Sequence, residues 1–373
     1  MKTAVFSIVS PNYRHFVRVL MKSVERHHPR WDRFVLLVGH GVPPDRESFT
    51  TIPLDAIGLP DPRRFCFRYT LLELNTAVKP WMFAYLFARG YDRVVYLDPD
   101  IVVYSPLAEL DALPPETFLV LTPHLTGSIG GDEHPSERSI LLAGAYNLGF
   151  LCVSRHAELP RFLQWWQEKL EYQCVVEPAR GLFVDQRWMD LTPGLFPDVA
   201  ILRHEGYNVA YWNFRQRSVT DLTVNGQPLR FFHFSGFDPA HPELASKHQH
   251  GLKVANVPGI GALFADYQTA LLAAGWESFR DAPYPFAAFT DGTLIPNAAR
   301  VAYRQSEELQ SAAGADPFTR PELFRGLRDV TRGTLASKAG AWSYRILSSA
   351  RPLVRLFPRS MRTAMRELLL GRR

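Results

Sequence analysis

The stretch Val94-Val95-Tyr96-Leu97-Asp98-Pro99-Asp100 decides the fold, because an apolar run of strand length ends directly in two acidic residues. The β-branched and aromatic run predicts a buried strand, and the Asp-Pro-Asp that follows predicts its carboxyl end. Side chains alternate along a strand, so we expect Asp98 and Asp100 to point to the same side. Ligands of open α/β sheets bind beyond the carboxyl ends of strands, which makes this position the expected functional site.

The segments around this stretch alternate between strand and helix patterns. Ala4–Val9 and Phe34–Val38 are β-branched and aromatic runs of strand length, and apolar residues recur at helical spacing over residues 16–24. Pro80 and Gly90 stand where a helix is expected to begin and to end. These repeated strand–helix–strand units predict an α/β fold, with a mostly parallel sheet flanked by helices on both faces.

Further along the chain the same patterns continue. Tyr146–Leu151 is predicted to be a loop entering a buried strand, and Phe231–Gly236 a strand that ends in a turn. Leu159–Tyr172 is predicted to be a helix, and Asp185–Leu191 the beginning of another. From about residue 315 the pattern changes to a broken amphipathic helix.

Composition excludes several classes of protein. Hydrophobic residues make up 46% and charged residues 21% of the 373 residues, which excludes a disordered or fibrous chain. The three cysteines are unclustered, so we expect neither a disulfide framework nor a cysteine zinc site, and a reducing cytosol fits best. The first apolar run is too short for a signal peptide, and no window approaches the ~18 apolar residues of a spanning helix. We therefore expect a cytoplasmic protein.

The net charge of +5 belongs to the C-terminal part of the chain. Residues 320–373 hold 13 Lys and Arg against 3 acidic residues, which leaves 29 basic and 34 acidic residues before them. Because this main part is mildly acidic, nucleic acid is not an expected partner. Arginines recur every three or four residues between Arg351 and Arg366, as in basic amphipathic helices that bind anionic membrane surfaces. An ordinary helix with a solvated basic face is the alternative.

The two aspartates of the opening stretch are candidate metal ligands. Two hard carboxylates suit Mg²⁺ or Mn²⁺, whereas an Asp-Pro-Asp turn without a ligand is the alternative. His233 lies at the end of a predicted strand, just before the turn Ser235-Gly236, where glycine lets the backbone approach a ligand closely. An imidazole ligand would favour Mn²⁺ over Mg²⁺. The alternative for His233 is a hydrogen-bonded core residue.

Other polar residues lie beside predicted strands and helices. Lys79 comes just before a predicted helix, whose N-terminus attracts phosphate, although a solvated surface lysine is the alternative. Asn147 with Gly149, and Asp185 with Gln186, are polar pairs next to apolar runs. Alone, these pairs could also be caps or turn residues.

The order and spacing of these features resemble a known family. From Met1 to about residue 250, the chain resembles the metal-dependent GT-A glycosyltransferases, most closely the glycogenin-like and galactosyltransferase-like family 8 type. The resemblance implies the GT-A fold, a nucleotide-sugar donor and retention of the anomeric configuration. The segments that carry it are Thr76-Ala77-Val78-Lys79, Tyr96-Leu97-Asp98-Pro99-Asp100, Tyr146-Asn147-Leu148-Gly149, Asp185-Gln186, Gly206-Tyr207-Asn208 and His233-Phe234-Ser235-Gly236.

The resemblance also implies roles for single residues. In that type, the two aspartates and the histidine, here Asp98, Asp100 and His233, bind Mn²⁺, which bridges the donor diphosphate. Matching positions put Asn12 and Tyr13 near the nucleotide, Lys79 near the donor phosphate or sugar, Asn147, Asp185 and Gln186 around the transferred sugar, and Gly149, Ser235 and Gly236 along the donor.

The chain departs from the family pattern at one position. The family 8 type usually continues from His-x-x-Gly to Lys-Pro-Trp, but here Phe237-Asp238-Pro239 follows, with Pro239 at the position of the lysine. We predict that Lys247 supplies the missing cation. The catalytic candidates are then Asp185, as nucleophile or as positioner of the sugar, together with Gln186, Asn147 and Lys247.

The resemblance also suggests domains and partners. Residues 1–250 would form the catalytic domain, residues 251–315 would pack on it, and residues 316–373 would form a basic helical tail. The acceptor would be a glycan or a lipid-linked molecule, with the loop Thr122–Arg138 as the expected acceptor region. A lipid-linked acceptor would suit a tail bound peripherally to the inner face of a membrane.

Three other functions compete with this one. Asp98-Pro99-Asp100-Ile101-Val102 fits the Asp-x-Asp-x-Thr/Val motif of HAD-type phosphatases, but it lies far from the chain start and the sequence contains no Asp-Asp pair. A dinucleotide-dependent oxidoreductase would need a GxGxxG motif after a strand, which is absent. A non-catalytic protein that binds nucleotide-sugars or carbohydrate on the same fold would not need the metal-ligand set.

Overall fold

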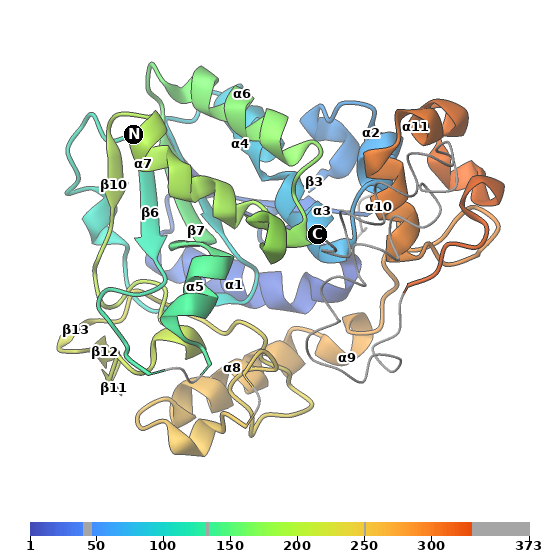
Figure 1. Ribbon diagram of the computed structural model, residues 1–373. Coiled ribbons are helices and arrows are strands. Elements are labelled where there is room, and N and C mark those ends of the chain that lie inside the picture. Colours follow the sequence, from blue (N-terminus) through green and yellow to red (C-terminus); the bar gives the residue numbers. More distant parts are fainter. Residues whose placement is uncertain (40–46, 132–133, 250, 330–373) are drawn as a thin grey trace, which may run out of the picture. The chain divides into compact units, whose positions relative to one another are not determined.

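The computed structural model describes residues 1–39, 47–131, 134–249 and 251–329 (Figure 1). The chain divides into two compact units, one formed by Met1–Pro60 and Leu71–Pro285, the other by Asp61–Thr70 and Phe286–Arg373. The first unit contains every residue predicted for the site. The basic helix predicted around Arg351–Arg366 lies outside the described residues.

A seven-stranded sheet forms the core of the first unit. Its strands, in spatial order, are β10 (Val199–Ile201), β6 (Leu119–Pro123), β7 (Tyr146–Ser154), β4 (Arg93–Leu97), β1 (Thr3–Val9), β2 (Asp32–Leu37) and β3 (Thr50–Pro53). β7 runs antiparallel to its neighbours β4 and β6, whereas all other adjacent pairs are parallel. The predicted mostly parallel sheet is confirmed, and β1, β2 and β4 occupy the predicted strand segments within a few residues. β7 is already a strand at Tyr146, where the sequence predicts a loop that enters a buried strand.

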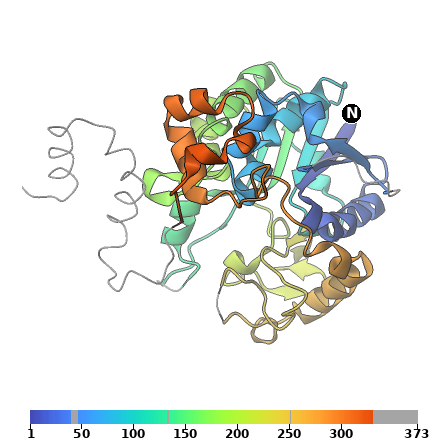
Figure 2. The same cartoon turned by 90° about the vertical axis from the view of Figure 1, so that its right-hand side faces the viewer.

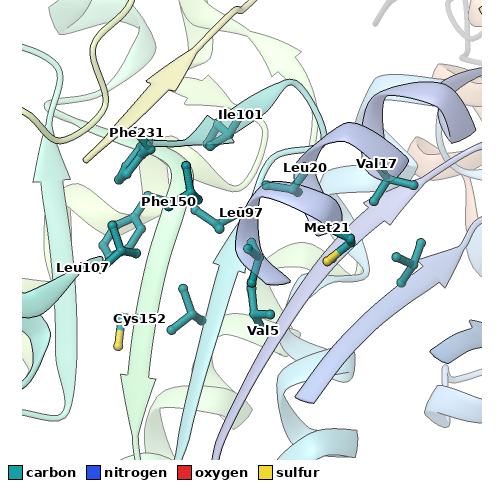
Figure 3. Close-up of a cluster of buried hydrophobic side chains, with 14 of the residues drawn as sticks. Val5, Val17, Leu20, Met21, Leu97, Ile101, Leu107, Phe150, Cys152 and Phe231 are labelled. Atoms are coloured by element: carbon teal, nitrogen blue, oxygen red, sulfur yellow. The ribbon is translucent and has the colours of Figure 1, made fainter. Parts of the chain in front are cut away.

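Helices cover both faces of this sheet (Figure 1). The helices of the first unit are α1 (Arg14–His27), α3 (Leu71–Ala77), α4 (Lys79–Phe87), α5 (Glu137–Ala143), α6 (Leu159–Leu170), α7 (Thr192–Leu195), α8 (Gly261–Ala273) and α9 (Trp276–Phe279). Because side chains alternate along β1, Val5 packs with Leu20 and Met21 of α1 (Figure 3). Phe6 points to the other face, where its ring centroid lies 4.9 Å from that of Phe83 on α4.

A short antiparallel pair of strands extends the acidic stretch beyond β4. β5 (Ile101–Val103) pairs with β14 (Phe231–His233), and His233 stands opposite Ile101 in the register. This pairing brings a residue from late in the chain next to the acidic pair. The other short strands are β8 (Val176–Glu177), β9 (Leu182–Phe183), β11 (Val219–Thr220), β12 (Thr223–Val224) and β13 (Gln227–Pro228).

A second apolar cluster holds β14 in place. Phe232 and Phe234 pack against Phe264 and Tyr267 of α8, and the rings of Phe234 and Tyr267 stack with centroids 3.9 Å apart. α8 lies beside the small sheet of β11 to β13 (Figure 2), and residues of both belong to the same cluster. Burial of these aromatic rings, each worth on the order of 2 kcal/mol, stabilises the segment that carries His233.

The second unit has an aromatic core of its own. Phe67 makes edge-to-face contacts with Tyr303, at 5.0 Å between ring centroids, and with Phe318, at 5.1 Å. The buried guanidinium of Arg300 donates to the carbonyl of Phe67 at 2.9 Å. Its helices are α2 (Pro62–Phe67), α10 (Asn297–Gln305) and α11 (Glu307–Ala313), with 3₁₀ turns at Pro317–Thr319 and Pro321–Phe324.

Two predicted helices differ in detail from the structure. The helix predicted over Leu159–Tyr172 ends at Leu170, as α6. The segment predicted to begin a helix at Asp185 instead forms a 3₁₀ helix over Gln186–Leu191, followed by the single turn of α7. The remaining 3₁₀ segments of the first unit are Pro11–Tyr13, Leu54–Ile57, Ala108–Leu110, Pro178–Arg180, Tyr211–Asn213 and Val254–Asn256.

Candidate functional site

Asp98, Asp100 and His233 come together at the carboxyl end of β4. Nε2 of His233 lies 3.1 Å from a carboxylate oxygen of Asp100 and 3.7 Å from one of Asp98. One ligand atom from each of the three residues lies within 4.8 Å of the others, so together they could hold a metal ion. The imidazole is 3% exposed, whereas the carboxylates of Asp98 and Asp100 are 29% and 17% exposed. The group is therefore anchored in the interior and open on its acidic side.

The histidine and the carboxylates of this group favour each other's charged forms. Burial opposes ionisation of Asp100, but the adjacent His233 lowers the pKa of this carboxyl. Burial likewise acts to lower the pKa of His233, and the two carboxylates outweigh it and raise that pKa. The buried hydroxyl of Tyr96 donates to a carboxylate oxygen of Asp98 at 2.5 Å. Asp98 is thus held in place by a hydrogen bond from its own strand.

Gly149 on β7 lets the imidazole approach the sheet. A Cβ atom at this position would lie 2.7 Å from Nδ1 of His233 and 2.8 Å from Oδ1 of Asn147, closer than real Cβ contacts. The carbonyl of Gly149 meanwhile accepts from the backbone N–H of Asp98 at 2.8 Å. The absence of a side chain at Gly149 therefore makes room for a metal-ligand candidate next to the strand that carries the acidic pair.

Gly149→Ala is expected to displace His233 from Asp100. Overpacking of this kind costs about 1–3 kcal/mol in the free energy of unfolding. If the three residues hold a cation, with Mn²⁺ as the probe, movement of His233 should weaken its binding by on the order of tenfold or more. Gly194→Ala is the matched control, because a Cβ at Gly194 meets nothing within 4 Å. Urea unfolding and Mn²⁺ titration of both variants measure the effect. Wild-type Mn²⁺ affinity in Gly149→Ala would contradict the close approach.

Lys79 and Asp185 form a buried ion pair beside this group. The ammonium lies 2.7 Å from a carboxylate oxygen of Asp185, and both side chains are 2% exposed. Lys79 also donates to the carbonyl of Leu148 at 3.0 Å and lies 4.2 Å from the ring centroid of Tyr96. Burial raises the pKa of Asp185, while the ammonium of Lys79 opposes that shift. The predicted phosphate ligand and the predicted nucleophile or sugar positioner are therefore paired with each other.

Asn147 lies at the centre of a buried amide network. Its Oδ1 accepts from the backbone N–H of Gly149 and from Nδ2 of Asn208, both at 3.0 Å. Its Nδ2 donates to Oε1 of Gln186 at 3.2 Å and lies 3.3 Å from Nε2 of His124. These contacts use the full hydrogen-bonding capacity of the Asn147 amide.

Asn12 and Tyr13 lie in the 3₁₀ segment Pro11–Tyr13, directly before α1. Oδ1 of Asn12 accepts from the hydroxyl of Ser10 at 2.7 Å. The ring of Tyr13 stacks on Phe16 with centroids 4.7 Å apart. Burial, followed by the negative charges of Asp100, Asp238 and Asp98, raises the pKa of Tyr13 to about 12. Tyr13 is therefore within electrostatic reach of the acidic pair.

The turn after β14 contains Ser235 and Gly236, and it contacts the backbone of Lys247. Gly236 has a φ of +76°, and its carbonyl accepts from the backbone N–H of Lys247 at 2.9 Å. A Cβ at Gly236 would lie 2.7 Å from Oγ of Ser246. Ser235 is half-buried, whereas the side chain of Lys247 is exposed. The structure thus places the backbone of Lys247 at this turn and directs its side chain to solvent.

Comparison with known proteins adds relatives and solved structures. No protein-family model matches the chain. YfnF of Bacillus subtilis (strain 168), named an uncharacterized protein, is 29% identical over 154 residues, which cover 39% of this chain and 50% of YfnF. The chain spans about half the length of the curated relatives it matches.

The similar solved structures include glycosyltransferases. The galactosyltransferase LgtC, crystallised with donor and acceptor sugar analogues, is 18% identical with a TM-score of 0.43, over 72% of this chain and 95% of LgtC. The apo-form glycosyltransferase GlyE of Streptococcus pneumoniae TIGR4 is 17% identical with a TM-score of 0.45, over 78% of this chain and 67% of GlyE.

Several residues of the site were given no role of their own from the sequence. Tyr96, His124 and Asn208 contact the predicted residues directly, as described above, and Trp212 packs edge-to-face against His124 and His233. His248 is near enough to Asp100 for that charge to act on its pKa, which burial lowers. His124 carries the same signal as Asp98, a polar residue just after an apolar strand, and could have been found by it.

The described residues contain no helix that is both long and apolar enough to cross a membrane.

Proposed function

We propose that this chain is a retaining glycosyltransferase of the GT-A type. It would move a sugar from a nucleotide-diphosphate sugar, with UDP-sugar as the first choice, to a glycan or lipid-linked acceptor. The observation that carries the proposal is the Asp98–Asp100–His233 group at the carboxyl end of β4, beside a buried ion pair and a buried amide network. The motif order described from the sequence adds the substrate class.

The three side chains fit a divalent cation. Two carboxylates and one imidazole are hard and borderline ligands, and the nitrogen ligand favours Mn²⁺ over Mg²⁺. The exposed side of Asp98 and Asp100 leaves room for a substrate anion. When bound, the ion would neutralise charge that develops on the nucleotide diphosphate as it leaves.

The chain's own residues would orient the donor around this group. Tyr96 fixes the carboxylate of Asp98 by its hydrogen bond. The amides of Asn147 and Gln186 are rigid, because they bond to one another and to backbone groups. Asn208 connects this pair to His233. Asp185 is ion-paired and 2% exposed, which supports a positioning role for this carboxylate rather than a nucleophilic one.

In the proposed reaction no side chain is a general base. The acceptor hydroxyl attacks C1 of the sugar on the face from which the diphosphate departs. The bond from C1 to the acceptor oxygen forms as the bond from C1 to the phosphate oxygen breaks, and the acceptor proton passes to the leaving phosphate. The configuration at C1 is retained, and the nucleotide diphosphate is released.

The acceptor would bind over the loop between β6 and α5. Nη1 of Arg215 donates to the carbonyl of Gly130 at 3.1 Å, and Oε1 of Gln216 accepts from the backbone N–H of Thr126 at 3.2 Å. The loop begins at His124, which lies 3.3 Å from Nδ2 of Asn147, so its start borders the buried amide network. Binding specificity often resides in such loops on a rigid scaffold.

A donor screen tests the proposal. With Mn²⁺ present, we expect the purified chain to release nucleotide from one member of a panel of UDP-, GDP- and dTDP-sugars, and EDTA to stop the release. Release of phosphate from simple phosphomonoesters without sugar transfer would instead indicate a phosphatase. Binding of a nucleotide-sugar with no turnover, against any acceptor or water, would indicate a binding protein.

A further inference from the structure

We infer that Asn208 is a positioning residue that fixes the tautomer of His233, so that Nε2 presents its lone pair to the proposed metal site. The inference deepens the proposed function and rests on its metal site. It starts from backbone groups whose hydrogen-bonding roles are unambiguous and proceeds through two side-chain amides to the imidazole. Amide orientations and histidine tautomers follow from such partners.

The first step fixes the orientation of Asn147. The backbone N–H of Gly149 can only donate, so the atom of Asn147 that it contacts at 3.0 Å must be the oxygen, Oδ1. Gln186 agrees with this orientation. Its Oε1 accepts from the backbone N–H of Leu148 at 3.1 Å, and its Nε2 donates to the carbonyl of Ala143 at 2.9 Å. Oε1 of Gln186 is therefore an acceptor for Nδ2 of Asn147.

The second step carries this orientation to Asn208. Because Oδ1 of Asn147 is an acceptor, the atom of Asn208 that faces it at 3.0 Å must be the donor, Nδ2. The same nitrogen lies 3.3 Å from the hydroxyl of Thr122. The remaining atom, Oδ1 of Asn208, lies 3.1 Å from Nδ1 of His233. An amide oxygen only accepts, so Nδ1 of His233 must carry a hydrogen.

The third step concerns the opposite side of the imidazole. Nε2 is the atom that faces Asp100 and Asp98, at 3.1 and 3.7 Å. In the metal-free chain the carboxylate of Asp100 accepts a hydrogen from Nε2, so both ring nitrogens carry one. A bound cation would replace the Nε2 hydrogen and use that lone pair, while Nδ1 keeps its hydrogen. Metal-binding histidines commonly donate their second N–H to a carbonyl or carboxylate, which fixes the ring and the tautomer. Here the acceptor is Oδ1 of Asn208, whose Nδ2 also donates to Asn147 in the buried amide network.

Asn208 is suited to this role by its backbone as well. It is fully buried and has a φ of +55°, in the left-handed region that asparagine tolerates better than most residues. Nδ2 of Asn213 donates to its carbonyl at 2.9 Å and holds the backbone in this conformation. A short side chain with one donor and one acceptor then reaches Asn147 on one side and His233 on the other.

The consequence is a rigid link between the proposed cation and donor-sugar positions. Asn147 was expected to touch the sugar, but its amide is engaged on all sides by Gly149, Asn208, Gln186 and His124. We assign Asn147, like Asn208, a positioning role. Loss of the Asn208 side chain should therefore disturb His233 and Asn147 together.

The tautomer of His233 in the wild-type chain is the first test. Ring-¹⁵N histidine NMR of the metal-free protein, with His233 assigned from His233→Gln, distinguishes a protonated nitrogen from one with a lone pair. We expect a hydrogen on Nδ1 in the metal-free chain. A lone pair on Nδ1 would overturn the inference. This measurement needs no metal, so it stands even if wild-type protein does not bind Mn²⁺, an outcome that would contradict the metal site of the proposed function.

Variants of Asn208 are the second test. Asn208→Gly tolerates the positive φ and removes only the side chain, and it should weaken Mn²⁺ binding about 10–100-fold, measured by EPR of free Mn²⁺. Asn208→Asp keeps an acceptor for His233 but loses the donor to Asn147. It should hold Mn²⁺ at least as tightly as wild type while turnover falls.

The matched control is Asn225→Gly, at an asparagine with a φ of +50° in an exposed turn. We expect this control to bind Mn²⁺ as wild type does, since Asn225 contacts neither His233 nor Asn147 among the described residues. Wild-type affinity in Asn208→Gly, or equal losses in Asn208→Gly and Asn208→Asp, would overturn the inference. Circular dichroism of each variant separates loss of binding from loss of fold.

Discussion

Asp100→Asn is expected to abolish the proposed Mn²⁺-dependent sugar transfer while the fold survives. The substitution keeps the size of the side chain and removes the charge nearest to Nε2 of His233, at 3.1 Å. A bound divalent ion would contribute several kcal/mol to stabilising the proposed leaving diphosphate, so turnover should fall by about a thousandfold or more. Nucleotide release from the preferred donor, together with Mn²⁺ titration, measures both losses in one preparation.

The control for Asp100 is Asp111→Asn. Asp111 pairs with Arg93 at the opposite end of β4, and its side chain is 82% exposed. The Asp111 side chain lies in solvent, and the buried guanidinium of Arg93 keeps its hydrogen bond to the carbonyl of Leu110 at 2.9 Å. This variant should therefore retain wild-type turnover and Mn²⁺ affinity. Wild-type turnover in Asp100→Asn, or in the unmodified chain with EDTA, would refute the metal role. A donor that is bound but not turned over by wild type would refute the enzymatic role.

The sheet could be predicted from local pattern because its strands are short apolar runs bounded by turns. The end of β4 at Leu97 followed from the Asp-Pro-Asp, and the placement of the acidic pair followed with it. The direction of β7 could not be predicted in this way. Its residues are apolar on both faces, and this pattern is the same in a parallel and in an antiparallel strand.

Site residues that belong to a short sequence motif could be predicted. Contacts between residues far apart in the sequence could not. His233 was named from its strand end, but its position next to Asp100 depends on the pairing of β5 with β14. The ion pair of Lys79 with Asp185 joins residues far apart in the chain, and no local pattern encodes it. Asn208 lay in a recognised motif, yet its role depends on the positive φ and on contacts from three other segments.

Breaking the buried pair should destabilise the chain strongly. Lys79→Met leaves the carboxylate of Asp185 without its cation in a site that is 2% exposed, which costs about 3–5 kcal/mol. Urea unfolding measures the loss, and Arg180→Met is the control. Arg180 pairs with Glu177 on the surface, and loss of such a pair should cost less than about 1 kcal/mol.

The loss in Lys79→Met should depend on pH. Burial raises the pKa of Asp185, and the positive charge of Lys79 opposes this rise. Lys79→Met removes that charge, so the pKa of Asp185 should rise further. A carboxyl whose pKa is higher in the folded than in the unfolded state stabilises the fold at low pH. This contribution is complete below the unfolded-state pKa and is lost as the pH rises through the folded-state pKa. The variant should therefore be less destabilised at about pH 5 than at about pH 8. A pH-independent loss would mean that packing, and not the unpaired charge, causes it.

The double variant Lys79→Met with Asp185→Asn separates stability from function. Removing both charges leaves no uncompensated ion, so the free energy of unfolding should return to within about 1 kcal/mol of wild type. Sugar transfer at sub-saturating donor should not return, since the proposed donor site would lose the pair that borders Tyr96 and Leu148. Recovery of both quantities would make the pair purely structural. Recovery of stability alone places Lys79 and Asp185 in the machinery that holds the donor sugar, and a raised KM with unchanged kcat would assign them to binding rather than to the transition state.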